Sequence, residues 1–194
     1  MNMIISAVSQ GLLWSILALG LFVSFRILDL DDMTTEGAFP LGAAVAVQAI
    51  TLGANPYIAI IFAIIAGSSA GLITGFLITK LQIPSLLAGI LTMTGLYSIN
   101  LRVMGRANIS LLGKNTIFTV FENMNLPRHF DTITLGLLVV VMIIGLYVIF
   151  FKTEFGQAVI ATGDNEAMAR SLGISTNTMK IVGLMISNGI VALA

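Results

Sequence analysis

Residues 37–79 read GAFPLGAAVAVQAITLGANPYIAIIFAIIAGSSAGLITGFLIT, without a single Asp, Glu, Lys or Arg. A helix needs about 20 apolar residues to cross the hydrocarbon core of a bilayer. The stretch is therefore long enough for two membrane helices, which we predict at 38–52 and 57–79. The Gly-Ala-Asn-Pro sequence at 53–56 is typical of a turn and would join them.

The rest of the chain repeats this pattern. Further charge-free stretches cover 1–25, 81–101, 132–151 and 181–194. Over 194 residues the composition is 57% hydrophobic and 9% charged, with a mean hydropathy of +1.03, whereas soluble domains carry about 25% charged residues. We predict an all-α, polytopic membrane helix bundle that forms one transmembrane domain. Its six spanning helices are expected at 4–26, 38–52, 57–79, 84–101, 132–151 and 177–194.

Several functional classes find no support in the composition. The net charge is zero, which gives no basis for binding nucleic acid. The chain has no cysteine, so disulfides and thiolate metal sites are excluded. His129 is the only histidine and stands alone in a predicted loop. Since no phosphate-binding loop or Ser–His–acid set is present either, we predict no metal site, no catalytic residues and no ATPase site.

Small residues recur at every fourth position of the predicted helix 57–79. They are Ala63, Gly67, Gly71 and Gly75. Overlapping G-x-x-x-G units of this kind let another helix approach closely. We favour packing within the chain over a dedicated dimerisation face.

Basic residues indicate the orientation. With six spans, Arg26, Lys80, Lys152, Arg170 and Lys180 fall on one side, which the positive-inside rule makes cytoplasmic. The N-terminus is then outside. The loop 102–131 is also basic yet falls outside, so it reflects either a miscounted span or a functional surface. The last helix ends without a polar or aromatic anchor at 191–194, and we expect the chain to be a piece of a longer protein.

A polar segment at 152–175 interrupts the apolar chain. Thr153 is expected to cap a first short helix that ends near Gly163, and Asp164 to cap a second. Gly173 followed by Ile174 is typical of a glycine C-cap. Met168 and Leu172 then share one helix face. The segment is either an amphipathic helix lying at the membrane surface or, as we favour, a docking element.

The same segment resembles a known signature. Its pattern T-x-x-G-x-x-x-x-A-x-G-x-N-x-x-x-A-x-x-x-G-I looks like the coupling-helix signature of bacterial ABC-importer permeases of the branched-chain amino acid and ribose type. The matching residues are Thr153, Gly156, Ala161, Gly163, Asn165, Ala169, Gly173 and Ile174. In that family the segment docks on the ATP-binding subunit.

Two other stretches carry the resemblance further. Residues 83–93 are similar to a proline-led segment that enters a central helix of the family. Residues 29–42 resemble a segment of a subgroup of amino-acid ABC permeases, and differ from it at Met33, Thr35 and Ala38. The resemblance covers nearly the whole chain, and family members continue for several more helices.

The acidic segment around Asp29–Glu36 has two readings. Four carboxylates in such a short stretch cannot face lipid, so it is either a solvated cytoplasmic loop or an unwound stretch beside the pathway. A calcium loop is disfavoured because its ligand pattern is absent. Under the second reading the pathway residues are Thr34, Thr35, Glu36 and Gly37, joined by Tyr97 and Asn100 on 84–101. Tyr97 could equally be an interface anchor, and Asn100 a partner in an interhelical hydrogen bond.

The resemblance implies the permease subunit of an ABC importer in the bacterial inner membrane, moving a small solute, an amino acid, inward. It would be surrounded by lipid and work as a homodimer or paired permease. It would act with cytoplasmic ATP-binding subunits, which hold the ATP, and an extracytoplasmic substrate-binding protein; the chain itself would carry no cofactor. Expected coupling residues are the eight matches together with Glu166, Met168, Arg170 and Leu172. Expected docking residues for the binding protein are Arg102, Arg106, Lys114 and Arg128.

Two alternatives stay open at this level. An ion-coupled secondary transporter would need inverted repeats with broken helices, and no convincing repeat is found in the sequence. A non-transporting membrane scaffold would leave the signature at 153–174 unexplained.

Overall fold

The computed structural model describes residues 2–105 and 130–194, and within these ranges every element is a helix. The elements are α1 (Asn2–Leu21), the π-helical turn η1 (Phe22–Ile27), α2 (Thr34–Thr51), α3 (Pro56–Thr79), α4 (Ser85–Met104), α6 (Phe130–Lys152), α7 (Glu154–Asp164), α8 (Glu166–Ser171) and α9 (Thr176–Leu193). The predicted all-α class is confirmed.

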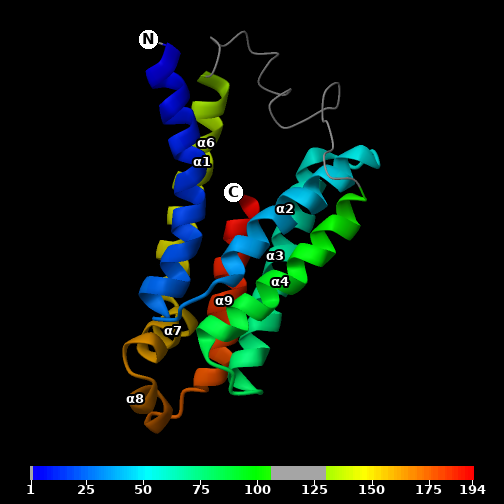
Figure 1. Cartoon of the computed structure of the whole chain (residues 1–194). Coiled ribbons are helices and arrows are strands. Elements are labelled where there is room, and N and C mark those ends of the chain that lie inside the picture. Colours follow the sequence, from blue (N-terminus) through cyan, green and yellow to red (C-terminus); the bar gives the residue numbers. More distant parts are fainter. Residues whose placement is uncertain (1, 106–129) are drawn as a thin grey trace.

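The long helices form two groups around α9 (Figure 1). Helices α1 and α6 pack together on one side, and α2, α3 and α4 form the other group. Helix α9 lies between the groups and contacts α1, α2 and α3. The short helices α7 and α8 lie together at one end of the bundle. The last helix of the chain is therefore its structural centre.

Four helices are long and apolar enough to span a bilayer. They are Ile5–Ile27, Pro56–Thr79, Ser85–Met104 and Ile133–Lys152, and the chain is a multi-pass membrane protein. Helices α2 and α9 have 18 residues each and are not among these four. Their assignment as the fifth and sixth spans stays a prediction.

The small-residue stripe of α3 is the contact face for α9. Ala63, Gly67 and Gly71 are buried, and a Cβ added to Gly71 would overlap the carbonyl oxygen of Leu184 in α9. At Gly75 an added Cβ would lie 2.9 Å from the Cα of Ile181. The backbones approach so closely that only glycine fits. Packing within the chain, as favoured from the sequence, is confirmed.

The predicted polar interruption at 27–37 is shorter than expected. Helix η1 continues to Ile27, and α2 begins at Thr34 instead of 38. The Asp32 carboxylate accepts a hydrogen bond from the Thr34 backbone N–H at 2.9 Å, and the Thr35 hydroxyl donates to the Asp32 carbonyl at 3.1 Å. The Asp32 side chain favours a helix start here because it satisfies one of the first free N–H groups of α2. The reading of residues 34–37 as an unwound stretch was therefore wrong.

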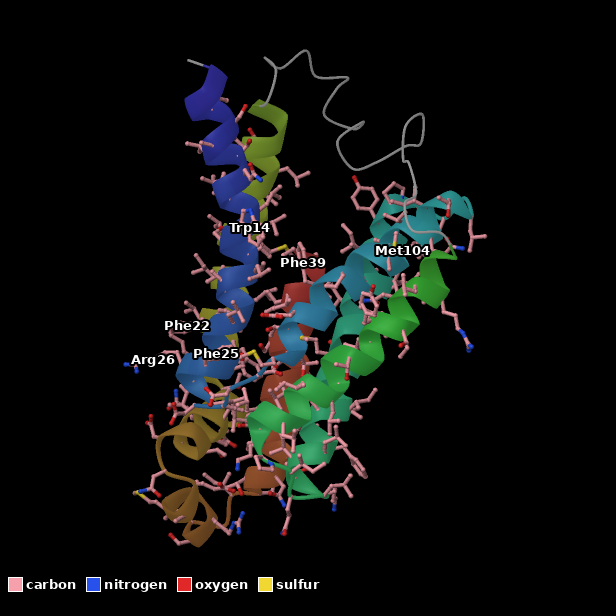
Figure 2. The ribbon with its side chains drawn as sticks, viewed as in Figure 1. Trp14, Phe22, Phe25, Arg26, Phe39 and Met104 are labelled. Atoms are coloured by element: carbon pink, nitrogen blue, oxygen red, sulfur yellow. The ribbon has the colours of Figure 1, made fainter. Side chains whose placement is uncertain are left out.

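The helix ends that carry the basic residues meet at one end of the bundle. The C-terminal end of α3, next to Lys80, packs beside the first turns of α9, while Lys152 ends α6 directly before α7. Gly163 of α7 touches η1, whose last turn holds Arg26, and Arg26 points away from the bundle (Figure 2). This grouping agrees with the side predicted to be cytoplasmic.

Candidate functional site

The first part of the site is the element formed by residues 153–175, called here the α7–α8 element. Thr153 caps α7 as predicted: its hydroxyl oxygen accepts a hydrogen bond from the Gly156 N–H at 3.2 Å. The same hydroxyl donates to the Phe150 carbonyl at 2.6 Å. Gly156 is buried against that same turn of α6. The chain therefore turns sharply from α6 into α7 with its backbone groups satisfied.

The junction between α7 and α8 differs from the expectation. Helix α7 runs through Gly163 to Asp164, and the cap of α8 is Asn165, whose side-chain oxygen accepts from the Met168 N–H at 3.0 Å. The prediction that Asp164 is the cap was wrong by one residue. Gly163 does not break the helix; it lies where an added Cβ would overlap the carbonyl oxygen of Ile27. Its role is to let α7 pack directly on η1.

The C-terminal end of α8 is capped as predicted. Gly173 adopts a left-handed conformation with φ of +84°. Its N–H donates to the Arg170 carbonyl, and the Ile174 N–H donates to the Ala169 carbonyl, both at 3.1 Å. Ile174 also packs against the buried cluster that contains Val159 of α7. This paired bonding is the glycine-terminated helix end expected from the sequence.

An ion cluster attaches α8 to α9. The Glu166 carboxylate accepts hydrogen bonds from Lys180 Nζ at 2.7 Å and from Arg170 Nη2 at 2.9 Å. The Thr176 hydroxyl donates to the same carboxylate at 3.2 Å. The hydrogen bond from Lys180 is the main reason why the pKa of Glu166 is lowered from its ordinary value of 4.5, and partial burial opposes it. Lys180 and Thr176 are on α9, so the cluster spans the turn between the two helices.

Three large apolar side chains are exposed on the α7–α8 element, among polar ones. Phe155, Met168 and Leu172 are exposed by 62%, 61% and 69%. Ala169, in contrast, is buried, and Ala161 is half-buried. Met168 and Leu172, which were predicted to share one helix face, are thus both exposed, and Phe155 is an exposed apolar residue of α7.

The second part of the site is a pocket of about 300 Å³ between α2 and α4, called here the Glu36 pocket. It is lined by Glu36, Gly37, Pro40, Met93, Thr94, Tyr97 and Asn100. Four of the six residues predicted for the pathway therefore come together here. The Asn100 amide group donates to the Gly37 carbonyl at 3.4 Å, so the predicted interhelical hydrogen bond of Asn100 is also present.

The other two predicted pathway residues lie elsewhere. Thr34 is fully buried, and its hydroxyl lies 2.6 Å from that of Thr74, which donates to Thr92 at 3.0 Å. These three hydroxyls join α2, α3 and α4, so Thr34 is a packing contact and not part of a pocket wall. Thr35 is buried and lines a different cavity, described next.

That second cavity lies between α1 and α2 and has a volume of about 510 Å³. Trp14 of α1 and Phe39 of α2 stack across it, with ring centroids 6.1 Å apart (Figure 2). Phe25, Asp32 and Glu36 also line it. Glu36 therefore stands on the wall of both cavities. We call this one the Trp14 cavity.

A buried polar contact joins α9 to the start of α2. The Asn188 amide donates to the Asp32 carboxylate at 2.7 Å, and both residues are almost fully buried. Asp32 was singled out from the sequence as one of four carboxylates, whereas Asn188 was missed. A polar residue in an apolar membrane helix is itself a signal of function or of a buried partner, but the partner lies far away in sequence. Lys180 was missed as a partner of Glu166 for the same reason.

The residues expected to dock a binding protein are mostly outside the described part of the chain. Arg106, Lys114 and Arg128 lie in the segment 106–129. Arg102 is in the last turn of α4, which ends at Met104, and not in a loop as predicted. A short connection at residues 80–84 joins α3 to α4, and the two helices run antiparallel. The C-terminal end of α4 therefore lies at the end of the bundle away from the α7–α8 element (Figure 1).

Comparison with known proteins places the chain in a family. Residues 3–194 match the family described as branched-chain amino acid transport system / permease component. The chain is 42% identical over its full length to a tyrosine transport system permease protein of Clostridioides difficile, and covers 63% of that protein. It is 38% identical over 193 residues to an uncharacterized protein of Rickettsia prowazekii, of which it covers 66%.

A more distant relative is the autoinducer 2 import system permease protein LsrC of Yersinia enterocolitica. It is 30% identical over 164 residues, which are 84% of this chain and 44% of the relative. No solved structure matches the chain significantly. The chain spans about two thirds of the length of the first two relatives. Because the family match extends over residues 3–194, the chain belongs to the branched-chain amino acid transport system permease family.

Proposed function

We propose that this chain is the membrane-spanning permease part of an ABC importer that carries a small solute, an amino acid, into the bacterial cell. Family membership supports the class. The single structural observation that carries the proposal is the α7–α8 element, which is firmly capped and attached to α9 while exposing Phe155, Met168 and Leu172. An apolar surface rimmed by polar residues is typical of a protein–protein contact.

The proposed partner at this surface is a cytoplasmic ATP-binding subunit. That subunit would hold the ATP, and this chain would contribute no catalytic residue or cofactor. The permease would pair with a second copy or a related permease, with lipid around the pair. The name of the relative from Clostridioides difficile favours an aromatic amino acid as the solute.

Movement of the α7–α8 element would reach the pathway through α9. The cluster around Glu166 holds α8 to the first turns of α9. Further along α9, Asn188 bonds Asp32 directly before α2, and α2 carries Glu36 at the wall of the Glu36 pocket. Only a difference in binding energy between two states can shift such an equilibrium. In this proposal, docking of the ATPase supplies that difference.

Substitution of Gly163 tests the coupling. Gly163→Val should force α7 away from η1, because the new side chain would overlap backbone that cannot rotate aside. We expect the full-length complex, reconstituted in proteoliposomes with its ATPase and binding protein, to hydrolyse ATP but to lose most of its uptake. Gly145→Val on α6 is the control, since a Cβ there meets no described atom within 4 Å. Uptake equal to that of the control would refute the coupling role.

Docking itself is tested at Leu172. Leu172→Asp should weaken association with the ATPase subunit, as an exposed apolar side chain at a contact is replaced by a charge. If association is unchanged and binding to lipid is lost instead, the element is a membrane-surface helix and not a docking site.

We also propose that the basic segment containing Arg102, Arg106, Lys114 and Arg128 receives the substrate-binding protein. The end of α4 that carries Arg102 lies opposite the α7–α8 element, which would suit a partner outside the cell, and opposite charges would steer the encounter. Reversing these charges should reduce affinity for the binding protein severalfold at low salt, as measured by surface plasmon resonance. An unchanged affinity would contradict the role.

A further inference from the structure

Glu36 is an exposed carboxylate at the depth of a spanning helix. It lines the Glu36 pocket together with Met93, Thr94 and Tyr97, which occupy the middle of α4, a helix long enough to cross the bilayer. In the described part of the chain no basic side chain forms an ion pair with Glu36. A charge at this depth is costly unless it faces water or a partner. Packing alone therefore does not explain a carboxylate at this position.

The groups around Glu36 are mainly hydrogen-bond acceptors. Asn100 is 7% exposed and lines the same pocket, yet its Oδ1 has no hydrogen-bond partner among the described residues. A buried polar atom without a partner is destabilising, so this oxygen is a candidate acceptor for a ligand. Pro40 has no N–H, so the Glu36 backbone carbonyl lacks the donor that an α-helix would normally give it. The Glu36 carboxylate and the Asn100 amide thus belong to residues that line the same pocket.

Few donors balance these acceptors. The Thr94 hydroxyl is already used, since it donates to the carbonyls of Ile90 and Leu91 at 3.0 and 2.9 Å. Among residues 2–105 and 130–194, no Lys, Arg or His lines the pocket. The remaining wall includes Met93, Pro40 and Tyr97, which brings an apolar ring and one hydroxyl that can donate or accept. A ligand for this site must bring several N–H donors, positive charge and an apolar body.

We propose that the Glu36 pocket binds the ammonium group of the transported solute, with Glu36 as its counter-charge and Asn100 as a second acceptor. This inference rests on the proposed transport function and adds the part of the solute that the permease recognises. A primary ammonium carries three donors and one positive charge. Since none of the described lining residues is basic, they offer no ion pair to a carboxylate on the solute, and the ammonium group is preferred.

The test measures weak binding to the full-length complex in lipid nanodiscs by saturation-transfer NMR. The probes are tyramine, which has an ammonium but no carboxylate, L-tyrosine, which has both, and 3-(4-hydroxyphenyl)propionate, which has only the carboxylate. Tyramine and tyrosine should bind, and the propionate should not. Glu36→Gln should raise the Kd for tyramine at least about tenfold, as expected for a hydrogen bond to a charged group.

Gly95→Ala is the control, because Gly95 is on α4 but does not line the pocket, and a Cβ added there meets no described atom within 4 Å. It should leave the Kd for tyramine unchanged. If Glu36→Gln fails to fold, Glu36→Asp replaces it, and this variant should still bind tyramine in preference to the propionate. Equal binding of tyramine and the propionate, or equal Kd values for wild type and Glu36→Gln, would overturn the proposal. So would absence of any binding, the result expected if a second copy of the chain fills the pocket.

Uptake and ATPase association are scored in the same preparations, so that two failures can be told apart. Normal ATP-driven uptake without ammonium preference at the pocket overturns only the inference about Glu36. If the wild-type protein does not associate with the ATP-binding subunit, the proposed function itself is overturned.

Discussion

Single side chains decide where the short helices of the α7–α8 element begin. Thr153 and Asn165 are both in extended conformation and accept the first free N–H groups of α7 and α8. Asp164 and Asn165 are both good capping residues in general, so sequence alone does not separate them. The backbone separates them, because Asp164 is still helical and the extended residue that follows it takes the cap position.

The cap can be tested by exchanging each residue for alanine. Asn165→Ala should cost about 1 kcal/mol of local helix stability, as the Met168 N–H loses its acceptor. Asp164→Ala should have almost no effect. Hydrogen exchange of residues 166–171 measures this directly, with roughly fivefold faster exchange expected only for Asn165→Ala. Equal acceleration in both variants would contradict the assignment of the cap.

At the scale of elements, the attachment of α8 to α9 depends on one carboxylate. Glu166 holds Lys180 and Thr176 of α9 and Arg170 of α8. The three groups come from two helices joined by a sharp turn at Gly173. Because Lys180 is far from Glu166 in sequence, local periodicity cannot reveal their contact. Of the bonds made by Glu166, only the ion pair with Arg170, four residues further along the same helix, can be predicted from the sequence.

This attachment should depend on pH. The pKa of Glu166 is lowered in the folded protein, chiefly by the hydrogen bond from Lys180. A lowered pKa means that the stabilisation is fully present above the ordinary value of 4.5 and is lost as pH falls through the folded-state value. The difference in Tm between wild type and Glu166→Gln should therefore be constant near neutral pH and vanish in acid. A difference that persists below the folded-state pKa would show that the charge of Glu166 is not the cause.

Helices α2 and α9 show a second effect at this scale. Both carry polar residues that form hydrogen bonds with neighbouring elements. The Thr34 hydroxyl bonds that of Thr74, Ser187 donates to the Gly20 carbonyl at 2.8 Å, and Asn188 donates to Asp32. Polar residues in membrane helices commonly satisfy each other across helices. The polar residues of α9 thus serve its central position in the bundle.

At the scale of the whole molecule, the hydrogen bond between Asn188 and Asp32 connects α9, which holds the α7–α8 element, to the start of α2, which carries Glu36. Asn188→Asp should be strongly destabilising, by roughly 3 kcal/mol or more, because two buried carboxylates would face each other without a donor. The double exchange Asp32→Asn/Asn188→Asp should recover part of the loss. In the double variant the amide introduced on the α2 side donates to the carboxylate introduced on α9, while the amide oxygen still accepts from the Thr34 N–H.

Thermal unfolding of the full-length protein in detergent measures the recovery. A lower Tm for each single exchange, with partial rescue in the double variant, supports a direct hydrogen bond. If the double variant is no more stable than Asn188→Asp, the two residues do not act as a pair. If the contact transmits movement, the amount of solute taken up per ATP hydrolysed should fall in the single variants and recover in part in the double variant. If this amount is the same in all variants, the role of the contact is purely structural.

The sequence by itself determined the class of the protein and most of its elements. Long charge-free stretches required membrane helices, since a soluble fold needs more charge on its surface. The stripe at Gly67 and Gly71 predicted close packing, because only small residues allow backbones to touch. Thr153 and Gly173 marked helix ends through local bonding to their own backbone. All of these features act over a few residues along the chain, and for this reason they are visible in the sequence.

Only the tertiary structure decided which distant groups meet. It placed Glu36, Tyr97 and Asn100 on one pocket, and moved Thr34 out of it into a contact with Thr74. It also turned the predicted loop before α2 into a helix start held by Asp32. These outcomes depend on the relative positions of helices that lie far apart in the sequence. Side-chain chemistry states what a residue can bind, but the packing of the bundle decides what it does bind.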